Sequence, residues 1–403
     1  MIKIGTDAIE ISRFSEMKNA ERFVQKNFTD RERAYFSERK NPYPHIAGAF
    51  AAKEAFSKYL GSGIRGFGLR DIEVLHDESG KPYICFKGTK ILADLSISHS
   101  DTIATAVVCG EEMSVSEVFC EYKKLLPQRH SKMHKGDCGR VFILAGSLGM
   151  TGAACLASKA AMRCGSGLVT LGTPECVQPV AASILLEVMT LPLPCRDGML
   201  SKTATETIIK RVSSSDVCAI GPGLGSSDDI IGITEAVLKE TIPCVIDADG
   251  LNAVAKNKDI LKFKNCDAVL TPHPGEMSRL TGISVDKIES DRTHAASDFA
   301  KEYNCTVVLK GHETVIAAPD GTVCINYTGN CGMASGGMGD VLTGVISSFI
   351  GQGCSPFDAA VLGVFLHGLA ADIGAENVGE FSLIASDVID CLPKAILKLQ
   401  NSN

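Results

Sequence analysis

The sequence GNCGMASGGMGDVLTG, residues 329–344, decides how the second half of this chain folds. Its glycines gather just before an apolar run, residues 341–350, that predicts a helix. These glycines are Gly332, Gly336, Gly337 and Gly339. Glycines before a helix let backbone N–H groups approach a ligand, and the helix N-terminus adds partial positive charge. The stretch therefore predicts an anion site, most often one for a phosphate.

Asp340 follows these glycines, at the point where the N–H groups converge. Its carboxylate would repel a phosphate, so its position needs a reason. One interpretation is that Asp340 caps the helix, because Asp is a favoured N-cap. The other makes Asp340 a base for a hydroxyl group that attacks a phosphoryl group held by the glycines. We favour the second, because an N-cap does not require four neighbouring glycines.

Short apolar runs alternate with helical stretches, such as residues 153–164, through the rest of the second half. The runs are residues 141–145, 168–171, 217–220, 244–246, 268–270 and 306–309. This pattern predicts a parallel sheet covered by helices on both faces. Such sheets bind ligands beyond the carboxyl ends of their strands.

Polar and glycine-rich motifs fall at those strand ends. They are Gly146 with Ser147, GPGLG at 221–225, DADGLN at 247–252, TPHPGE at 271–276 and KGHET at 310–314. Each alone has a structural interpretation: a plain turn, a helix start or, for His273, a structural histidine. GPGLG is neither a Walker A loop nor a dinucleotide fingerprint. Their shared place ahead of the glycine-rich anion site favours one ligand site.

The first half reads as a mixture of helices and strands. Residues 14–28 predict a helix with Lys18, Arg22 and Lys26 on one face, either as a solvated surface or as a docking stripe for an acidic partner. Residues 46–66 predict a mostly apolar helix that ends at Gly61 and Gly63.

Within that apolar helix, Glu54 and Lys58 lie one turn apart. An ordinary surface pair is one interpretation, but its alanine-rich surroundings call for a functional reason. Two strands are expected around the turn of Ser79, Gly80, Lys81 and Pro82. A further pair of strands is expected around the sequence SHSD, where His99 taken alone reads as a structural histidine.

Composition limits the classes of function. The 403 residues are 45% hydrophobic with a net charge of −7, and residues 1–112 hold equal numbers of acidic and basic side chains. This excludes the basic stripe of a nucleic-acid binder. The sequence has no apolar run of membrane-spanning length and no signal-peptide pattern near its start, so we expect a cytoplasmic protein. The 16 cysteines include no CxxC pair and read as small buried hydrophobes in a reducing cell, although one reactive thiol among them stays open.

The first half resembles the holo-acyl-carrier-protein synthase family of 4′-phosphopantetheinyl transferases. The matching motifs are GTDAIEISR, FAAKEAFSKYLGSGI, LRDIEV, SGKPY and SISHSD, in the family's order over residues 1–112. The resemblance implies that Asp7 and Glu54 hold Mg²⁺ beside the pyrophosphate of coenzyme A and that Lys58 is catalytic. It also implies that Arg13 and the basic helix meet the acyl carrier protein, and that His99 lies near the nucleotide end of coenzyme A.

One position departs from that family. A larger, often basic residue usually precedes the FAAKEA run, and Ala49 stands there in this chain. A missing guanidinium would remove a charge-assisted phosphate contact, so weaker binding of coenzyme A is the expected consequence.

The second half resembles the ADP/ATP-dependent NAD(P)H-hydrate dehydratases of the ribokinase-like superfamily. The stretch at 329–344 and TPHPGE are its most specific motifs, and the resemblance begins near Lys135. It implies that the adenine nucleotide contacts Lys310, Gly311, His312, Glu313, Thr314, Gly336, Gly337 and Gly339. It implies that the hydrated dinucleotide contacts Ala153, Gly223, Asn252, His273 and Asp340.

The implied chemistry converts the C6 hydroxyl of a hydrated nicotinamide into a leaving group. Asp340 would take the hydroxyl proton as the oxygen attacks the terminal phosphoryl of ADP, with Mg²⁺ neutralising the nucleotide. Loss of phosphate would then give NAD(P)H, AMP and phosphate. A small-metabolite kinase using the same site stays open as an alternative, and so does a non-catalytic oligomerising module in the first half.

The expected architecture is α/β with two domains. An α+β phosphopantetheinyl-transferase domain spans residues 1–112, a linker spans 113–135, and a doubly wound ribokinase-like α/β domain spans 136–403. The linker includes an expected helix at 115–126. The partners implied are the acyl carrier protein, coenzyme A, ADP and NAD(P)H hydrate, with neither nucleic acid nor membrane, and we expect a homo-oligomer.

Overall fold

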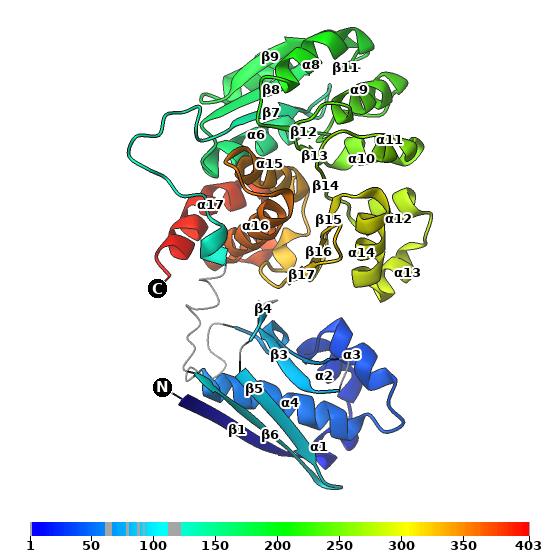
Figure 1. Cartoon of the computed structure of the whole chain (residues 1–403), viewed down its shortest axis with the longest axis vertical. Helices are drawn as coiled ribbons and strands as arrows, with labels where there is room; N and C mark the ends of the chain where they lie inside the picture. Colours follow the sequence, from blue (N-terminus) through cyan, green and yellow to red (C-terminus); the bar gives the residue numbers. More distant parts are fainter. Residues whose placement is uncertain are drawn as a thin grey trace. The chain divides into compact units, whose positions relative to one another are not determined.

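The computed structural model describes residues 2–60, 67–77, 80–86, 89–91, 93–111 and 122–402. The chain divides into two compact units (Figure 1). Unit 1 comprises Met1–Glu121 with Ser402–Asn403, and unit 2 comprises Tyr122–Asn401. Unit 1 is α+β and unit 2 is a doubly wound α/β fold, which confirms the predicted fold class.

Unit 1 is built on an antiparallel sheet with one helix packed on its inner face. The sheet order is β1(Ile2–Glu10), β6(Ile103–Glu111) and β5(Ala93–His99). The helix is α4(Tyr43–Tyr59), whose alanine-rich surface allows a very close approach to β1. A Cβ atom on Gly5 would lie 1.9 Å from the carbonyl oxygen of Ala55, so only glycine fits there.

Smaller elements complete unit 1. A second sheet holds β2(Ile72–His76), β3(Pro82–Phe86) and β4(Thr89–Lys90). Its first two strands lie on either side of the predicted turn, of which Ser79 lies outside the described residues. The helices are α1(Ser12–Ser15), α2(Ala20–Asn27), α3(Asp30–Ser37) and the 3-10 turn η1(Leu69–Asp71). The helix stop predicted at Gly61 and Gly63 also lies outside the described residues, and α4 ends at Tyr59.

The single helix predicted over residues 14–28 is wrong, because the chain breaks between α1 and α2. Phe14 and Phe23 both pack on Phe50, with ring centroids 5.7 and 5.8 Å away. Nine residues along one continuous helix would turn these two rings to opposite faces. The break lets both rings enter the core. Lys18 therefore lies outside the helices, while Arg22 and Lys26 stay exposed on α2.

Unit 2 is built on a nine-stranded sheet. From one edge to the other, the sheet order is β17(Val323–Asn326), β16(Thr314–Ala317), β15(Thr306–Leu309), β14(Ala268–Leu270), β13(Cys244–Ile246), β12(Val217–Ile220), β7(Arg140–Leu144), β8(Leu168–Pro174) and β9(Met189–Leu193). The strands from β15 to β9 pair in parallel, as predicted. The antiparallel pair β16 and β17 was not predicted, and the KGHET motif is its entry turn.

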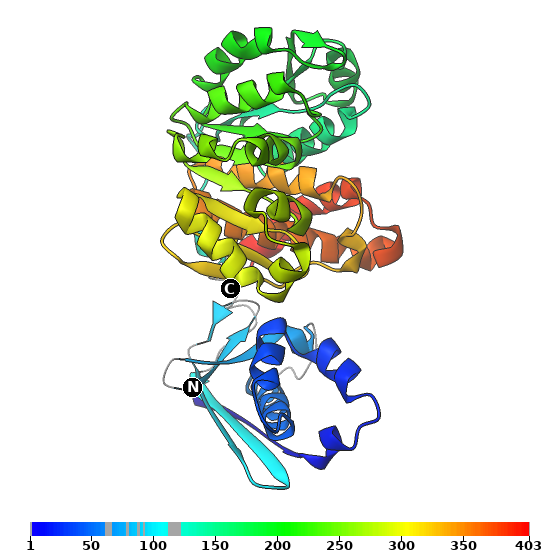
Figure 2. The ribbon, with the colours of Figure 1, turned by 90° about the vertical axis from the view of Figure 1, so that its right-hand side faces the viewer.

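Helices cover both faces of this sheet (Figure 1). One layer holds α6(Thr151–Arg163), α15(Met338–Gly351), α16(Pro356–Val378) and α17(Ala385–Gln400). The other holds α8(Thr205–Val212), α9(Asp228–Leu238), α10(Ala248–Lys256), α12(Pro274–Thr281) and α14(Arg292–Tyr303), which Figure 2 shows from the front. Shorter elements are α7(Gln178–Ile184), β10(Cys195–Arg196), β11(Met199–Leu200), η2(Lys202–Ala204), α11(Asp259–Lys262), α13(Val285–Ser290), η3(Cys331–Met333) and η4(Glu380–Ser382).

The strand order reverses between β7 and β12, which places a crevice there. From β12 the chain adds strands in one direction, and from β7 it adds them in the other. Doubly wound sheets bind ligands beyond the carboxyl ends of strands at such a switch point. The loops after the two strands meet, since the backbone N–H of Gly146 donates to the carbonyl of Pro222 at 2.8 Å.

The core helix α16 has the length and apolar character of a membrane span, but 78% of its most apolar window is buried inside unit 2. It packs on the sheet and on α15 and α17. Residues 122–125 of the predicted linker helix are helical, and Tyr122 stacks on Phe365 with ring centroids 3.9 Å apart. Residues 112–121 lie outside the described part of the chain.

Candidate active sites

The glycine-rich stretch forms the start of α15. Gly337 is the N-cap, with φ of +92°, and a Cβ atom on it would lie 2.6 Å from Leu156. The left-handed dihedral angle favours glycine there. Asp340 occupies the third helical position and makes no capping hydrogen bond. The capping interpretation of Asp340 is therefore wrong.

The carboxyl group of Asp340 has a strongly raised pKa. Burial and the negative charge of Asp247 raise its pKa from 3.8 to about 7, and Lys310 opposes the rise. A general base is most effective when its pKa lies near the working pH. The structure thus gives Asp340 the acid–base property that its predicted role requires.

A buried charged network lies beside Asp340, centred on Asp247. Asp247 follows β13, is 1% exposed and accepts a hydrogen bond from Lys310 Nζ at 2.7 Å. The hydroxyl groups of Thr271 and Thr343 donate to the same carboxylate at 2.7 and 2.9 Å. Burial disfavours the charged carboxylate, but Lys310 and these hydrogen bonds outweigh burial and lower the pKa of Asp247. Asp247 therefore joins two further strand ends to α15.

Lys310 brings the predicted nucleotide motif to the helix start. A Cβ atom on Gly339 would lie 3.3 Å from Lys310 Nζ and 3.6 Å from Asp247 Oδ2. Burial opposes a charge on this amine, but Asp247 and Glu276 raise its pKa. Lys310 is therefore a fixed cation beside the N-terminal turn of α15. A fixed cation next to helix N–H groups suits a phosphate.

The other residues of KGHET form the turn into β16. Gly311 has φ of +152° and Glu313 has φ of +57°, while the Thr314 hydroxyl donates to the Gly311 carbonyl at 2.9 Å. His312 is exposed at the tip of this turn. Gly336, a predicted nucleotide residue just before α15, is exposed with open space around it. The motif thus forms the turn that begins at Lys310 and leads into β16.

Two of the residues predicted to contact the dinucleotide are neighbours. A Cβ atom on Gly223 would lie 3.1 Å from the Cβ of Ala153 and 2.9 Å from that of Met150. Gly223 also has φ of +61°, and its carbonyl accepts a hydrogen bond from Ser147 Oγ at 2.8 Å. This pair lies at the switch point between β7 and β12, where a ligand would pass close to the backbone.

Asn252 and His273 lie at neighbouring strand ends and already have protein partners. The Asn252 amide donates to Asp249 at 3.2 Å and accepts from Arg279 Nε at 2.9 Å. His273 is the N-cap of α12, and its Nδ1 accepts from the Gly275 N–H at 3.0 Å. The His273 imidazole is half exposed, which leaves it reachable by a ligand.

Sequence reasoning missed the residues that organise this site, namely Asp247, Thr271, Glu276 and Thr343. Each lies inside a motif that was recognised, but none was assigned a role. The one available signal was a carboxylate placed directly after an apolar strand, where Asp247 stands. The contact between Asp247 and Thr343 spans 96 residues, so no local pattern could reveal it.

Unit 1 brings Asp7, Glu54 and Lys58 together by packing β1 on α4. Lys58 Nζ donates to Asp7 Oδ1 at 2.8 Å and to the Thr6 carbonyl at 3.0 Å. Burial and the charge of Asp7 raise the pKa of Glu54, while Lys58 and Arg13 oppose the rise. Two neighbouring carboxylates that repel each other suit a hard divalent cation, which would relieve the repulsion. The described residues hold no group of three or more metal-ligating side chains, so substrate oxygens or water would complete such a shell.

The predicted residues Arg13 and His99 lie on exposed parts of unit 1. The Arg13 guanidinium stands 5.6 Å from the centre of the Phe50 ring. The His99 ring meets that of His45 edge to face, with centroids 5.9 Å apart. Burial, Arg39 and the nearby imidazoles lower the pKa of His45. Ala49, the position of the departure, is buried at 5% exposure in the core of unit 1.

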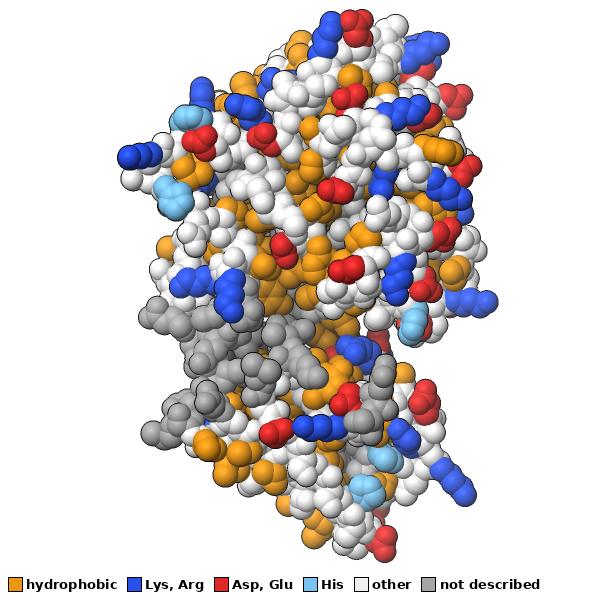
Figure 3. Space-filling model, in the orientation of Figure 1, with side chains coloured by type: hydrophobic (Ala, Val, Ile, Leu, Met, Phe, Trp, Pro, Cys, Tyr) orange, Lys and Arg blue, Asp and Glu red, His pale blue; other side chains and the backbone are white. Residues whose placement is uncertain are grey.

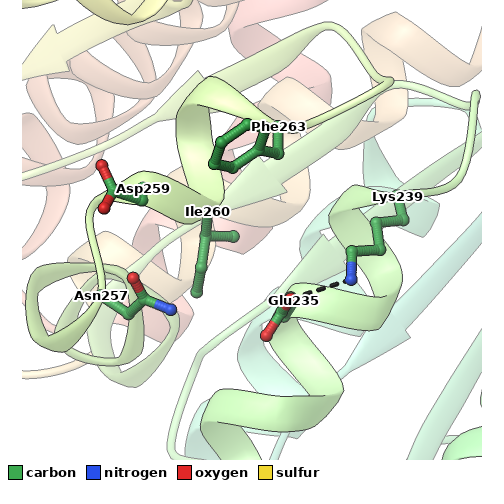
Figure 4. A pocket seen from close by; sticks show the side chains of 6 residues that line it. All are labelled: Glu235, Lys239, Asn257, Asp259, Ile260 and Phe263. Carbon is green, nitrogen blue, oxygen red and sulfur yellow. Dashed lines mark hydrogen bonds and ion pairs between the residues drawn. The ribbon is translucent and has the colours of Figure 1, made fainter.

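A separate pocket of about 210 Å³ lies between α9 and α11 (Figure 4). Lys239 Nζ forms an ion pair with Glu235 Oε1 there at 2.8 Å, and the exposed Phe263 ring lies on one side of the pocket. The other lining residues are Asn257, Asp259 and Ile260. The pocket lies at the end of α9 from which the chain enters β13, opposite the carboxyl ends of the strands. It is smaller than ordinary cofactor sites and is separate from the candidate active site.

These features define a doubly wound α/β protein with a glycine-capped helix start, a buried Asp–Lys pair and a carboxyl group of raised pKa beside it. Residues 141–394 match the NAD(P)H-hydrate dehydratase family, and the chain belongs to that family. Residues 3–110 match the 4′-phosphopantetheinyl transferase superfamily, in agreement with the resemblance of the first half.

Individual relatives agree with these matches. A bifunctional NAD(P)H-hydrate repair enzyme of Moorella thermoacetica is 45% identical over 277 residues, which are 68% of this chain and 52% of that protein. The ADP-dependent (S)-NAD(P)H-hydrate dehydratase of Bacillus subtilis is 36% identical over 67% of this chain and 93% of its own length. The crystal structure of a Bacillus subtilis ADP/ATP-dependent NAD(P)H-hydrate dehydratase, co-crystallised with ATP and Mg²⁺, matches 70% of this chain with a TM-score of 0.61 and 34% identity. The chain spans about half the length of the bifunctional relatives.

Proposed function

We propose that unit 2 dehydrates NAD(P)H hydrate with ADP as phosphoryl donor, giving NAD(P)H, AMP and phosphate. The observation that carries this proposal is Asp340, a carboxylate of pKa about 7 in the first turn of a glycine-capped helix. Family membership supports the substrate, because the Bacillus subtilis relative is an ADP-dependent (S)-NAD(P)H-hydrate dehydratase.

In this proposal the site residues divide into two groups around Asp340. Gly223, Ala153, Asn252 and His273 hold the hydrated dinucleotide. Residues 310–314, with Gly336, Gly337 and Gly339, hold ADP. Asp340 lies next to Lys310 and Gly339, so its carboxylate meets the hydroxyl group where the terminal phosphoryl is bound.

The chain's own residues supply each step of the proposed reaction. Asp340 removes the proton of the C6 hydroxyl, whose oxygen then attacks the terminal phosphoryl of ADP and releases AMP. Lys310 and the N–H groups at the start of α15 stabilise the charge on the phosphoryl oxygens. Loss of phosphate from C6, together with loss of a proton from the neighbouring ring carbon to solvent, restores the ring double bond. Mg²⁺, when bound with the nucleotide, would neutralise its phosphates.

We propose that unit 1 transfers 4′-phosphopantetheine from coenzyme A to a serine of the acyl carrier protein. The match of residues 3–110 and the cluster of Asp7, Glu54 and Lys58 support this activity. Asp7 and Glu54 would hold Mg²⁺, and Lys58 would neutralise charge or move the serine proton. Arg13 and the exposed cations of α2 would meet the acidic carrier protein, and His99 would lie near the nucleotide of coenzyme A.

We also propose that the protein forms a homo-oligomer. Figure 3 shows hydrophobic side chains on the outer surface of unit 1 over β1 and β6. Ile2 and Ile4 are 73% and 63% exposed, and Ile103 and Val107 lie on the same sheet at 44% and 40%. An apolar sheet face of this kind suits a homo-oligomeric contact. We place the domains at 1–112 and 136–403 with a linker at 113–135, in a cytoplasmic enzyme.

Replacing the base tests the dehydratase proposal. Asp340→Asn keeps the shape of the side chain and removes its capacity to accept the proton. We expect kcat to fall by roughly 10²–10⁴-fold, the usual range for general-base catalysis. Binding of ADP, followed by calorimetry, should stay within a few fold. Near-normal turnover of NADH hydrate in this variant would refute the assignment.

A further inference from the structure

Two cysteine side chains of unit 2 meet at the surface, although the sequence separates them by 19 positions. The Sγ atoms of Cys176 and Cys195 are 3.6 Å apart. Cys176 is exposed and Cys195 is partly exposed, so solutes reach both thiols. The sequence interpretation of the cysteines as buried hydrophobes does not describe these two.

Strand pairing brings the two cysteines into register. Pro174 at the end of β8 pairs with Leu193 at the end of β9, and each cysteine follows its strand end by two residues. The N–H of Glu175 donates to the Leu193 carbonyl at 2.9 Å, which extends the ladder toward the thiols. Neighbouring strands lie about 4.8 Å apart, within the Cα separations of about 4.4–6.8 Å that disulfides span. The two Sγ atoms, 3.6 Å apart, thus lie just beyond a strand pair whose general spacing falls in the range that disulfides span.

A second thiol pair in the same unit provides a contrast. Cys218 and Cys244 are directly paired on β12 and β13, but both lie in the core with at most 1% exposure. Their hydrogen bond and burial raise the pKa of Cys244 well above its usual value. A thiol of this kind is protonated and out of reach of oxidants. Accessibility thus separates the surface pair from the core pair.

We propose that Cys176 and Cys195 form a dithiol modification site that a hydroperoxide oxidises reversibly to a disulfide. One thiolate attacks the O–O bond of hydrogen peroxide, giving a sulfenic acid and water. The second thiol then displaces hydroxide from that sulfur and forms the S–S bond, with release of a second water. Two thiols lose two electrons and two protons in total, and one peroxide is reduced to two waters. Thiols of the cell reverse the reaction, as for other regulatory disulfides in reducing compartments.

The position of the pair connects it to the loops at the switch point. Cys195 begins the hairpin of β10 and β11, whose Gly198 carbonyl accepts a hydrogen bond from the Leu148 N–H at 2.9 Å. Met199 of the same hairpin lies against Gly225, with Sδ 2.7 Å from the place of a Cβ atom. A disulfide would therefore fix the base of a hairpin that contacts the loops after β7 and β12.

Peptide mapping of the full-length protein tests the proposal. The reduced protein is treated with hydrogen peroxide at pH 8.5, because burial and the neighbouring thiol of Cys195 raise the pKa of Cys176. Remaining thiols are alkylated, and trypsin with a glutamate-specific protease cuts the chain after Glu175, Glu187 and Arg196. We expect a disulfide-linked pair of peptides, 176–187 with 188–196, that dithiothreitol separates. Non-reducing electrophoresis should show that this species is monomeric.

Matched variants make the result decisive. Cys176→Ser and Cys195→Ser should each abolish the linked species, so the test does not depend on one variant folding. Cys331→Ser removes another exposed thiol, which bonds to Glu380 at 2.8 Å, and should leave the linked species intact. Full alkylation of Cys176 and Cys195 after peroxide treatment would overturn the proposal, as would a linkage only between two molecules.

A kinetic readout tests the connection to the loops, and it rests on the proposed function. Oxidation should change KM for NADH hydrate and leave KM for ADP unchanged, because the hairpin touches the loops after β7 and β12 rather than the Lys310 side. Equal KM values for the hydrate in both forms would refute that connection. The peptide map does not depend on activity, so failure of the dehydratase proposal would be recognised separately.

Discussion

Asp340→Asn should make unit 2 more stable at neutral and alkaline pH but not in acid. The folded protein raises the pKa of Asp340 from 3.8 to about 7, so the folded state binds more protons than the unfolded chain between these values. Stability therefore falls as pH rises through this window and levels off above pH 7. Asparagine does not titrate, so the variant keeps the stability that the wild-type protein loses as the pH rises. At about 1.4 kcal/mol per pKa unit, the free energy of unfolding of the variant should exceed that of the wild-type protein by at most about 4 kcal/mol at pH 8. Roughly 3 kcal/mol of this difference should appear between pH 5 and pH 8.

Scanning calorimetry of the ligand-free protein at pH 5 and pH 8 measures this effect. A domain of this size shifts its Tm by about 2–4 °C per kcal/mol, so the variant's advantage at pH 8 should exceed that at pH 5 by roughly 6–12 °C. Asp372→Asn serves as a control for the loss of an acidic side chain in unit 2. Asp372 accepts hydrogen bonds from Gly329 and Asn330, so its replacement should lower the stability of the protein rather than raise it. An equal Tm difference at both pH values would refute the assignment of a raised pKa to Asp340.

Three further changes probe other parts of the account. Burial raises the pKa of Asp340 most, and the charge of Asp247 raises it further. Asp247→Asn removes that charge, so the acid limb of the pH profile of kcat/KM should move to lower pH by about one unit, which is about 1.4 kcal/mol; an unmoved limb would contradict that coupling. Glu54→Gln should reduce phosphopantetheine transfer to acyl carrier protein, measured by mass spectrometry, by at least about 10²-fold while hydrate dehydration continues, and parallel losses of both activities would contradict separate sites. Ile4→Lys places a charge on the exposed apolar face of unit 1 and should shift the protein to a smaller species in light scattering, whereas an unchanged mass would place the oligomer contact elsewhere.

Local sequence patterns predicted most of the framework of unit 2. Apolar runs marked β12, β13 and β14 within a residue of their bounds, because buried parallel strands are apolar on both faces. Periodicity could not predict the break between α1 and α2, which arises from the packing of Phe14 and Phe23 on Phe50. The strands β16 and β17 were not predicted, because the sequence KGHET before β16 was interpreted as a binding motif.

The site residues divide in the same way. Glycines with special conformations, such as Gly337 and Gly223, stand in motifs that the sequence displays directly. The hydrogen bonds of Asp247 connect residues 24, 63 and 96 positions away, and only the folded sheet brings them together. The pairing of Cys176 with Cys195 likewise depends on the register of β8 and β9. Long-range pairing was therefore the information that the sequence alone could not supply.

The most direct test of the central claim is the product balance of the purified full-length protein with NADH hydrate and ADP. We expect absorbance to return at the reduced nicotinamide band, with one AMP and one phosphate formed for each NADH. ADP hydrolysis without NADH formation would contradict the account. Accumulation of a phosphorylated small metabolite in place of free phosphate would instead identify a kinase.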